Sequence, residues 1–266
     1  MKIMIIGGDK RNLYLTRRLN KKGHDAEWYC AEKYDGTHKR VQDFKSDIDS
    51  FDAVILPLPL TKDGETLSCP YSEKKITLAE IGAYIKDKIV FTSDDRISGK
   101  NYFSDKGVIV DNARLTAVGF LSELLAFETG DIMGKKALVT GFGNVAKCVC
   151  KILSDNGVSV FTVARNSVQR HEAAACGCSA MDFGEAGKRI SEFDYIVNTV
   201  PEKVFSDSVL AEIGAETAYF ELASGVPKET EKYRFAYIEC RGMPGKHTPK
   251  GAGEVIADFV CSELKE

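Results

Sequence analysis

The residues that most clearly indicate chemistry form a glycine-rich turn, Gly141–Ala146, with the pattern G-x-G-x-x-A. In such a turn Gly141 permits the sharp exit from a strand, and Gly143 leaves room for a pyrophosphate beside the backbone. Ala146 lets the following helix pack closely on the strand. The first amides of that helix and its dipole favour phosphate groups. We therefore expect a dinucleotide to be bound by five residues of this turn: Gly141, Gly143, Asn144, Val145 and Ala146.

The neighbours of this turn strengthen the interpretation, because the pattern by itself is common. A β-rich segment, Ala137–Thr140, precedes it, and an uninterrupted helix is expected over Val145–Leu153. A second strand, Val158–Val163, follows at the distance expected of a βαβ unit. The alternative is a purely structural turn between a strand and a helix.

The end of this second strand predicts which cofactor is bound. NAD-binding domains tend to place Asp or Glu there to hold the ribose 2′-hydroxyl, whereas this chain has Arg165-Asn166-Ser167. Arg165 is suited to pair with a 2′-phosphate, and the two following residues offer hydrogen bonds. We expect NADP, with NAD as the other candidate. In the alternative interpretation Arg165 is a solvated surface residue.

Two further loops of the same region are expected beside the nicotinamide end of the cofactor. Thr199-Val200-Pro201 follows a strand at Tyr195–Asn198, and Ser224 follows a strand at Ala218–Leu222. Thr199–Pro201 is equally consistent with a proline turn that simply ends its strand.

The amino-terminal part of the chain offers candidates for binding an anionic substrate. Gly7-Gly8-Asp9 follows the apolar segment Lys2–Ile6 but lacks the third small residue of a dinucleotide turn, since Arg11 stands there. The backbone amides of this turn and Arg11 are suited to a carboxylate, while Asp9 is equally suited to cap a helix. Other substrate candidates are expected at a strand end and at the start of a long helix: Pro57, Arg114 and Thr116.

A second dense cluster lies at Arg241–Gly253, just before an expected final helix. Lys246 and His247 within it are the catalytic candidates, because lysine attracts an anionic substrate and histidine exchanges protons near neutral pH. The alternative is a flexible, solvated connection.

Short apolar runs alternate with amphipathic segments along nearly the whole chain, which predicts the α/β class with parallel sheets covered on both faces. We expect two doubly wound parallel-sheet domains, of which the second is a Rossmann-type dinucleotide-binding domain. The first, a flavodoxin-like substrate domain, comprises residues 1–114 and is joined by a C-terminal helix at 250–266. A linker helix at 115–130, preceded by a strand at Val108–Val110, leads to the NADP-binding domain at 131–249. A ligand is expected between the two domains, at the carboxyl ends of the strands.

Composition excludes several other classes of protein. The 266 residues carry a net charge of −3, which gives no reason to expect nucleic acid as a partner. No apolar stretch is long enough to cross a membrane and no signal peptide is recognisable, so a cytoplasmic location is expected. The eight cysteines are best explained as small buried side chains, with metal or redox roles as the alternative, and we expect no metal site.

Taken together, motifs in a fixed order resemble the A-subunit family of dipicolinate synthase. They are Ile6-Gly7-Gly8-Asp9 with Arg11, Ile55-Leu56-Pro57, Gly141-Phe142-Gly143, Ala164-Arg165, Leu222-Ala223-Ser224, Met243-Pro244-Gly245 and Pro249-Lys250-Gly251-Ala252-Gly253. The resemblance implies a bacterial sporulation enzyme on a branch of lysine biosynthesis that oxidises dihydrodipicolinate to pyridine-2,6-dicarboxylate. It also implies a small dicarboxylate substrate and a partner, the flavoprotein-like B subunit of dipicolinate synthase.

Two other functions remain open at this stage. One is a different two-domain NADP-dependent dehydrogenase, of shikimate or 2-hydroxy acid type, because such enzymes share the architecture. A Lys–Asp or His–carboxylate catalytic pair would favour that interpretation. The other is a nucleotide-binding subunit without activity of its own. The sequence does not determine the oligomeric state, and a homo-oligomer is compatible with it.

Overall fold

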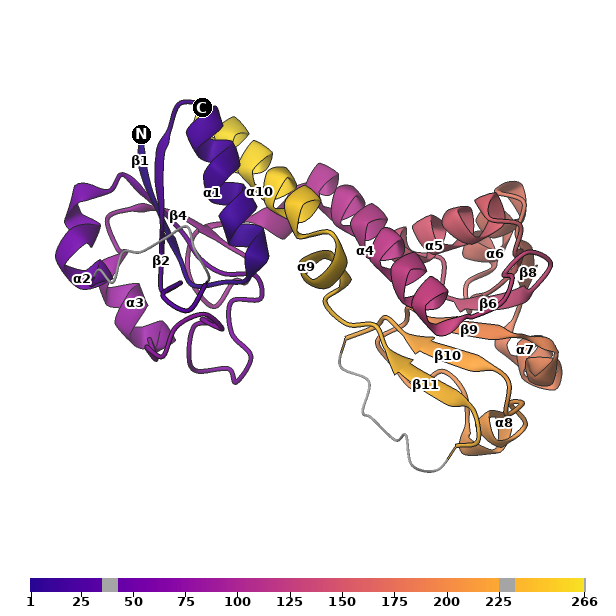
Figure 1. The fold of residues 1–266 in the computed structure, drawn as a ribbon. Helices are drawn as coiled ribbons and strands as arrows, with labels where there is room; N and C mark the ends of the chain where they lie inside the picture. Colours follow the sequence, from indigo (N-terminus) through magenta and orange to yellow (C-terminus); the bar gives the residue numbers. More distant parts are fainter. Residues whose placement is uncertain (35–42, 225–232, 266) are drawn as a thin grey trace. The chain divides into compact units, whose positions relative to one another are not determined.

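A computed structural model describes residues 1–34, 43–224 and 233–265 of the chain and divides it into two compact units (Figure 1). The first unit contains Met1–Asn112 together with Thr248–Glu266. The second unit contains Ala113–His247. Each unit has its own parallel sheet and its own apolar core.

The sheet of the first unit has five parallel strands in the order β2-β1-β3-β4-β5. This order is that of flavodoxin-like sheets, in which a ligand site is expected where the strand order reverses, next to β1. The strands are β1 (Lys2–Ile6), β2 (Asp25–Tyr29), β3 (Ala53–Ile55), β4 (Ile89–Thr92) and β5 (Lys100–Asn101).

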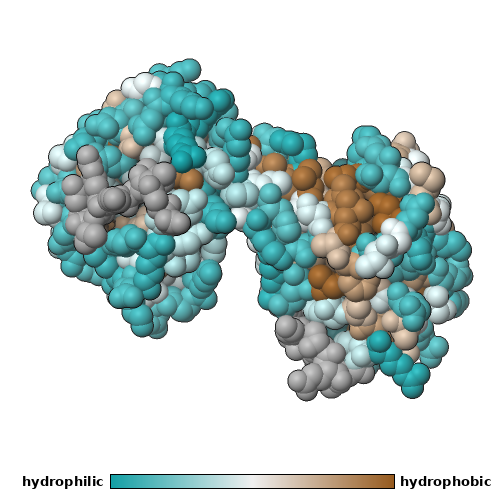
Figure 2. Space-filling model, in the orientation of Figure 1, coloured by the Kyte–Doolittle hydropathy of each residue, from teal (hydrophilic) through white to brown (hydrophobic). Residues whose placement is uncertain are grey.

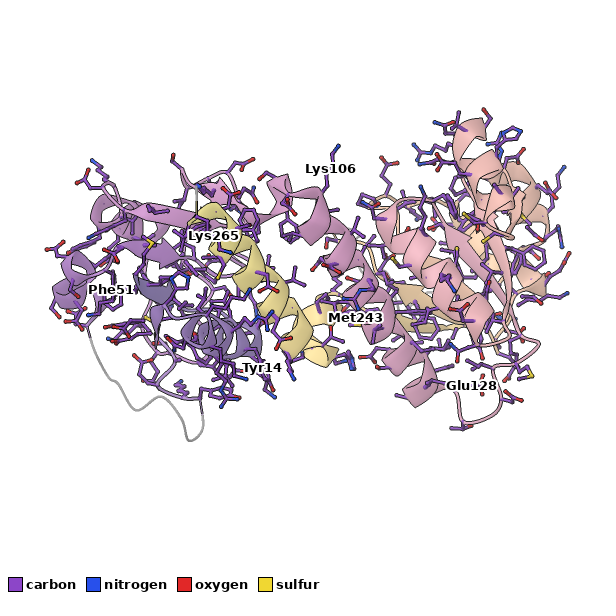
Figure 3. All side chains as sticks on the ribbon, turned by 90° about the horizontal axis from the view of Figure 1, so that it is seen from above. Tyr14, Phe51, Lys106, Glu128, Met243 and Lys265 are labelled. Carbon is purple, nitrogen blue, oxygen red and sulfur yellow. The ribbon has the colours of Figure 1, made fainter. Side chains whose placement is uncertain are left out.

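Two helices from opposite ends of the chain lie side by side in the first unit, α1 (Lys10–Lys21) and α10 (Pro249–Glu263) (Figures 1 and 3). Gly253 makes this close packing possible, because a Cβ there would lie 2.3 Å from the Arg11 carbonyl oxygen. The remaining helical segments of this unit are α2 (Phe44–Asp47), η1 (Ile48–Ser50), α3 (Leu78–Tyr84) and η2 (Tyr102–Ser104).

The sheet of the second unit has six parallel strands in the order β11-β10-β9-β6-β7-β8. Numbered within the unit, this is the order of a Rossmann sheet, with the reversal between β6 and β9. The strands are β6 (Lys136–Thr140), β7 (Ser159–Val163), β8 (Ser179–Met181), β9 (Tyr195–Asn198), β10 (Ala218–Glu221) and β11 (Ala236–Glu239). The expected fold class, two doubly wound parallel-sheet domains of which the second is Rossmann-type, is therefore confirmed.

Helices cover both faces of this second sheet. One core layer joins the sheet to α4 (Lys106–Phe127), α5 (Asn144–Asp155) and α6 (Ser167–Ala175). The opposite layer joins it to α7 (Phe183–Lys188), η3 (Ile190–Glu192) and α8 (Asp207–Ala211), and α9 (Met243–His247) follows β11. Apolar side chains remain exposed on the surface of this unit (Figure 2), among them Val118, Leu125, Phe127 and Met133.

Two expectations about local structure were wrong. Val108–Val110 is not a strand but lies in α4, which begins at Lys106 rather than near residue 115 (Figure 3). The β-branched run suggested a strand, but the Asp105 side chain accepts a hydrogen bond from the Val108 amide at 2.8 Å and starts a helix there. The segment Arg241–Gly253 is not an open loop either, since it contains α9 and the first turn of α10.

Helix α10 starts at Pro249 because proline fits the first turn of a helix, where no backbone donor is needed. All eight cysteines are free thiols, and five of them are buried. Among the described helices, none combines the length and the apolar character needed to cross a membrane. The described residues also contain no group of three or more side chains suited to hold a metal ion.

Candidate functional site

The glycine turn after β6 has the geometry that dinucleotide binding requires. Gly141 has a φ of +79°, which an L-residue adopts only with strain, and its amide donates to the Val163 carbonyl at 2.8 Å. A Cβ at Gly141 would also lie 3.0 Å from a methyl group of Val200. Ala146 is fully buried against the sheet. The turn is thus tied to β7 and lies close to the loop that follows β9.

Gly143 stands at the N-cap of α5 and is exposed. Its φ of −81° is ordinary, and a Cβ built there would meet no atom within 4 Å. The absence of a side chain at this position therefore serves neither the backbone conformation nor the packing of the folded chain. It leaves a space directly in front of the N-terminus of a 12-residue helix, where a phosphate group is favoured.

Three buried polar residues end the three central strands of this sheet and stand in register: Thr140, Asn198 and Glu221. We call them the polar row. The Thr140 hydroxyl donates to the Asn198 carbonyl oxygen at 2.5 Å, and the Asn198 amide nitrogen lies 2.9 Å from both oxygens of Glu221. The row lies directly below the loops that begin at Gly141, Thr199 and Leu222.

The loops that begin at Thr199 and Leu222 are anchored to the polar row. The Thr199 hydroxyl donates to the Thr140 carbonyl at 2.6 Å, and the Val200 amide donates to the side-chain oxygen of Asn198 at 3.1 Å. The Ala223 amide donates to Glu221 at 3.0 Å, one residue before the exposed Ser224. The residues expected around the cofactor are thus brought together at one edge of the sheet, with the exposed Pro201 at the end of the middle loop.

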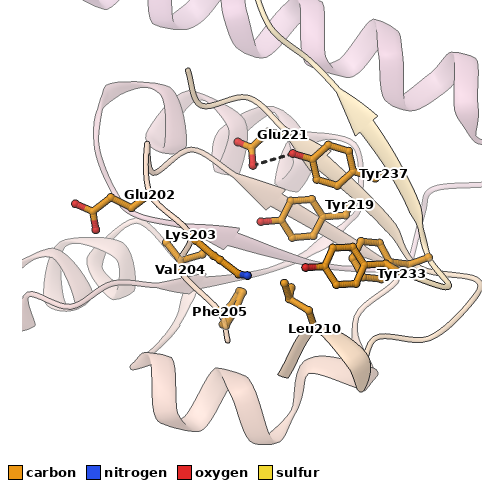
Figure 4. Close-up of a pocket in the computed structure, with 10 residues that line it drawn as sticks. Glu202, Lys203, Val204, Phe205, Leu210, Tyr219, Glu221, Tyr233 and Tyr237 are labelled. Carbon is orange, nitrogen blue, oxygen red and sulfur yellow. Dashed lines mark hydrogen bonds between the residues drawn. The ribbon is translucent and has the colours of Figure 1, made fainter. Parts of the chain in front are cut away.

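Glu221 is the acidic member of this row and is 1% exposed. Burial raises its pKa above the usual range, while hydrogen bonds from Asn198, the Ala223 amide and Tyr237 oppose the rise. Figure 4 shows Glu221 at the edge of an apolar cavity of about 120 Å³. The wall of that cavity includes stacked rings of Tyr219 and Tyr237, whose centroids are 5.4 Å apart.

Arg165 occupies the position that is expected to select the cofactor, directly after β7. Its guanidinium forms an ion pair with Glu202, and both side chains are more than half exposed. Asn166 caps α6 by accepting from the Val168 amide at 2.8 Å, and Ser167 is the first residue of that helix. An acid thus reaches Arg165 from a different loop, although no acid stands at this position in the sequence.

In the first unit the turn after β1 is largely satisfied by its own surroundings. The amides of Gly7 and Gly8 donate to the carbonyls of Tyr29 and Ser68 at 2.9 and 2.7 Å. Asp9 caps α1 by accepting from the Arg11 amide, and its carboxylate also accepts two bonds from the Arg11 guanidinium at 2.8 Å. The expected anion site on the backbone amides of Gly7 and Gly8 is therefore wrong, because these donors are already used.

The other substrate candidates are placed differently from one another. Pro57 is buried at the end of β3, and its carbonyl accepts from the Ser93 hydroxyl at 2.9 Å. Arg114 and Thr116 belong to the second unit and lie inside α4, because this helix starts at Lys106. The idea that they form a helix N-terminus for a carboxylate is therefore wrong.

Lys246 and His247 lie at the end of α9, where both contact one carboxylate that sequence reasoning missed, Glu123 of α4. The His247 Nε2 atom lies 2.6 Å from the Glu123 carboxylate, and the Lys246 ammonium donates to the same oxygen. These contacts hold the pKa of Glu123 below its usual range. Met243 at the start of α9 packs directly against Gly119 of α4, because a Cβ on Gly119 would lie 2.8 Å from the Met243 Cβ.

Glu123, Glu202 and Glu221 are the site residues that the motifs did not single out by role. Each is far along the chain from its partner, so no local spacing signals the contact. The only available signal for Glu221 was its position near the end of the strand expected at Ala218–Leu222.

Comparison with known families gives a consistent result. Residues 2–110 match the model of a family described as the N-terminal domain of the A subunit of dipicolinate synthase. The A subunit of dipicolinate synthase from Bacillus subtilis (strain 168) is 24% identical over 300 residues, which cover 100% of this chain and 96% of that protein. The chain resembles this protein over its whole length. The family resemblance expected from the sequence is thereby confirmed.

Solved structures show the same fold. The crystal structure of the A subunit of dipicolinate synthase from Bacillus halodurans matches with a TM-score of 0.84 at 24% identity, covering 100% of this chain and 98% of that one. A transhydrogenase from Sinorhizobium meliloti matches with a TM-score of 0.68 at 12% identity, covering 98% and 94%. The architecture is thus shared with the A subunit of dipicolinate synthase and with this transhydrogenase.

Proposed function

We propose that this chain is the A subunit of dipicolinate synthase, which oxidises dihydrodipicolinate to pyridine-2,6-dicarboxylate with a nicotinamide cofactor. The observation that carries this proposal is the space at Gly143 in front of α5, which a side chain would fill without any cost to the packing. The full-length similarity to proteins that carry the name of this enzyme supports the choice of reaction.

The residues of the second unit fit a dinucleotide. Gly141, Gly143 and the first amides of α5, including those of Asn144 and Val145, would hold the pyrophosphate. The adenosine end lies near Arg165, Asn166 and Ser167, where NADP is preferred if the Arg165 guanidinium exchanges Glu202 for a 2′-phosphate. Thr199, Val200, Pro201 and Ser224 would hold the nicotinamide end.

The substrate side of the first unit consists of Asp9, Arg11 and Pro57. Because Arg11 is 6% exposed and already bound to Asp9, a substrate carboxylate binds there by replacing Asp9 on the guanidinium. Such an exchange keeps the buried cation paired throughout, which avoids the cost of an isolated charge. Arg114 and Thr116, placed on α4, remain proposed substrate ligands through their side chains alone.

The balance of the reaction is simple. A bound NADP⁺ supplies a hydride acceptor, so one hydride leaves a ring carbon of the dihydropyridine, one ring proton is released, and an aromatic pyridine results. Aromatisation is favourable, so the protein mainly has to align the reactants and exclude water. His247 takes up the released proton, while Lys246 attracts the dianionic substrate. Glu123 holds both side chains in place and stabilises the protonated imidazole.

The test is direct incubation of the protein with NADP⁺ and the condensation product of aspartate semialdehyde and pyruvate. Pyridine-2,6-dicarboxylate should appear with its ultraviolet absorbance, in proportion to the NADPH formed. The assay is run with and without the B subunit, the partner that the family resemblance implies. No pyridine product under either condition would contradict the proposal.

One observation favours a second candidate, a two-domain dehydrogenase of shikimate or 2-hydroxy acid type. The pair of His247 and Glu123 is the histidine–carboxylate arrangement that such an enzyme needs for proton transfer. Reduction of NADP⁺ or NAD⁺ by a panel of 2-hydroxy acids and shikimate, with no turnover of the dihydropyridine, would favour this candidate. Tight NADPH binding without any turnover would instead indicate a nucleotide-binding subunit.

A further inference from the structure

We propose that Glu221 is a positioning residue for the cofactor loops, because it fixes the orientation of the Asn198 amide between three strands. This inference rests on the proposed function, since it concerns the same dinucleotide site. Glu221 itself lies below the loops and is 1% exposed, so it acts through Asn198 and the backbone rather than by touching the cofactor.

The argument begins with donors and acceptors in the polar row of Thr140, Asn198 and Glu221. The Asn198 side-chain nitrogen lies 2.9 Å from both Glu221 oxygens, and the Ala223 amide donates to one of them, so the NH₂ group of Asn198 is directed towards Glu221. Its carbonyl oxygen then faces the opposite way, where it receives the Thr140 hydroxyl at 2.5 Å and the Val200 amide at 3.1 Å. The same NH₂ group also reaches the Val200 carbonyl at 3.0 Å.

The orientation of Asn198 therefore determines the conformation of the loop at Val200. If the Asn198 amide were turned by half a rotation, its NH₂ group would face the amide of Val200, and two donors would oppose each other. The loop would lose its anchor directly beside Gly141, whose Cβ position lies 3.0 Å from Val200. The row thus links the loop beside the nicotinamide to the pyrophosphate turn.

Glu221 anchors the third loop as well. Its Oε1 atom accepts the Ala223 amide at 3.0 Å, and its Oε2 atom is 3.4 Å from the Tyr237 hydroxyl, the bond drawn in Figure 4. One buried carboxylate therefore holds the start of the segment that leads to Ser224 while it also holds Asn198. This double role distinguishes it from a buried acid that only completes the packing of its own strand.

The test uses Glu221→Gln, which keeps the size of the side chain but replaces one acceptor oxygen with a donor. The glutamine can then present its NH₂ group to Asn198, so the row loses one of the acceptors that favour the observed orientation of the Asn198 amide. NADPH and NADH titrations followed by fluorescence should show binding about tenfold weaker than in the unchanged protein, and the KM for the nucleotide should rise more than kcat falls.

A matched control lies at the other end of the same strand. The buried Thr217 hydroxyl donates to the Phe193 carbonyl at 2.9 Å, so Thr217→Val removes a hydrogen bond of the same sheet away from the loops. This variant should lose thermal stability but bind NADPH unchanged. Equal loss of NADPH affinity in both variants would show that Glu221 has only a structural role and would overturn the inference.

A second variant reverses the polarity of the contact. In the double variant Asn198→Asp with Glu221→Gln, the aspartate accepts from Thr140, Val200 and the new glutamine, so the orientation of the row is again enforced. NADPH affinity should recover in part over Glu221→Gln alone, because the aspartate cannot replace the bond from Asn198 to the Val200 carbonyl. If Glu221→Gln binds NADPH as well as the unchanged protein does, the inference fails alone. If the unchanged protein binds neither nucleotide, the proposed function fails with it.

Discussion

Replacing the two glycines of the turn after β6 one at a time separates binding from folding. Gly143 has an ordinary φ of −81°, and a Cβ there would meet no atom within 4 Å. Gly143→Ala should therefore cost about 1 kcal/mol or less, the difference between glycine and alanine at a helix N-cap. Gly141 has a φ of +79°, so Gly141→Ala adds strain of about 1–2 kcal/mol, besides the contact with Val200 at 3.0 Å.

For NADPH binding the order should be reversed: Gly143→Ala, which costs less stability than Gly141→Ala, should weaken binding more. The methyl group of Gly143→Ala enters the space proposed for the pyrophosphate, so NADPH affinity should fall at least tenfold, or about 1.4 kcal/mol. Thermal unfolding and fluorescence titration measure the two effects on the same samples. Gly214→Ala, a substitution in the same unit with only an ordinary contact at 3.5 Å, is the control. If Gly143→Ala binds NADPH normally, the turn is structural and our interpretation of it is refuted.

Three further predictions concern other parts of the chain. Glu202→Gln releases Arg165 from its ion pair, so affinity for NADPH should rise severalfold relative to NADH, and an unchanged ratio would remove Arg165 from the 2′-phosphate site. The lowered pKa of Glu123 means that its pairs contribute stability above the ordinary glutamate pKa of about 4.3, and that this contribution is lost as the pH falls through the lowered pKa. Glu123→Gln should therefore flatten the acid side of the stability–pH curve; a curve that keeps its slope would contradict this. Gly253→Ala should lower the melting temperature, because the added methyl group disrupts the packing of α1 against α10. Gly82→Ala in α3, with open space around it, should raise the melting temperature by adding up to about 1 kcal/mol of stability.

Local patterns predicted the fold well because parallel α/β structure repeats one local pattern, a short apolar strand followed by an amphipathic helix. The turn at Gly141–Ala146 needs only neighbouring residues to be recognised, and its geometry agrees with the expectation. The same local reasoning failed at Val108–Val110, where a β-branched run suggested a strand. There the cap provided by Asp105 and the continuation into α4 outweighed the intrinsic preference of three residues.

The candidate site could be predicted only in part, because its contacts join distant segments. Lys246 and His247 were recognisable as residue types, but Glu123 is their partner only because α9 packs beside α4. Arg165 was recognisable by position, but the approach of Glu202 from the loop after β9 was not. The amides of Gly7 and Gly8 looked available in the sequence, yet the fold directs both towards neighbouring carbonyls.

The most direct measurement of the central claim is the formation of pyridine-2,6-dicarboxylate by the protein in the presence of NADP⁺. The assay supplies the condensation product of aspartate semialdehyde and pyruvate and records pyridine absorbance together with NADPH. The account predicts equal amounts of both products, dependent on the nucleotide and abolished or strongly reduced by Gly143→Ala. NADPH formation without the pyridine, or no reaction with and without the B subunit, would contradict it.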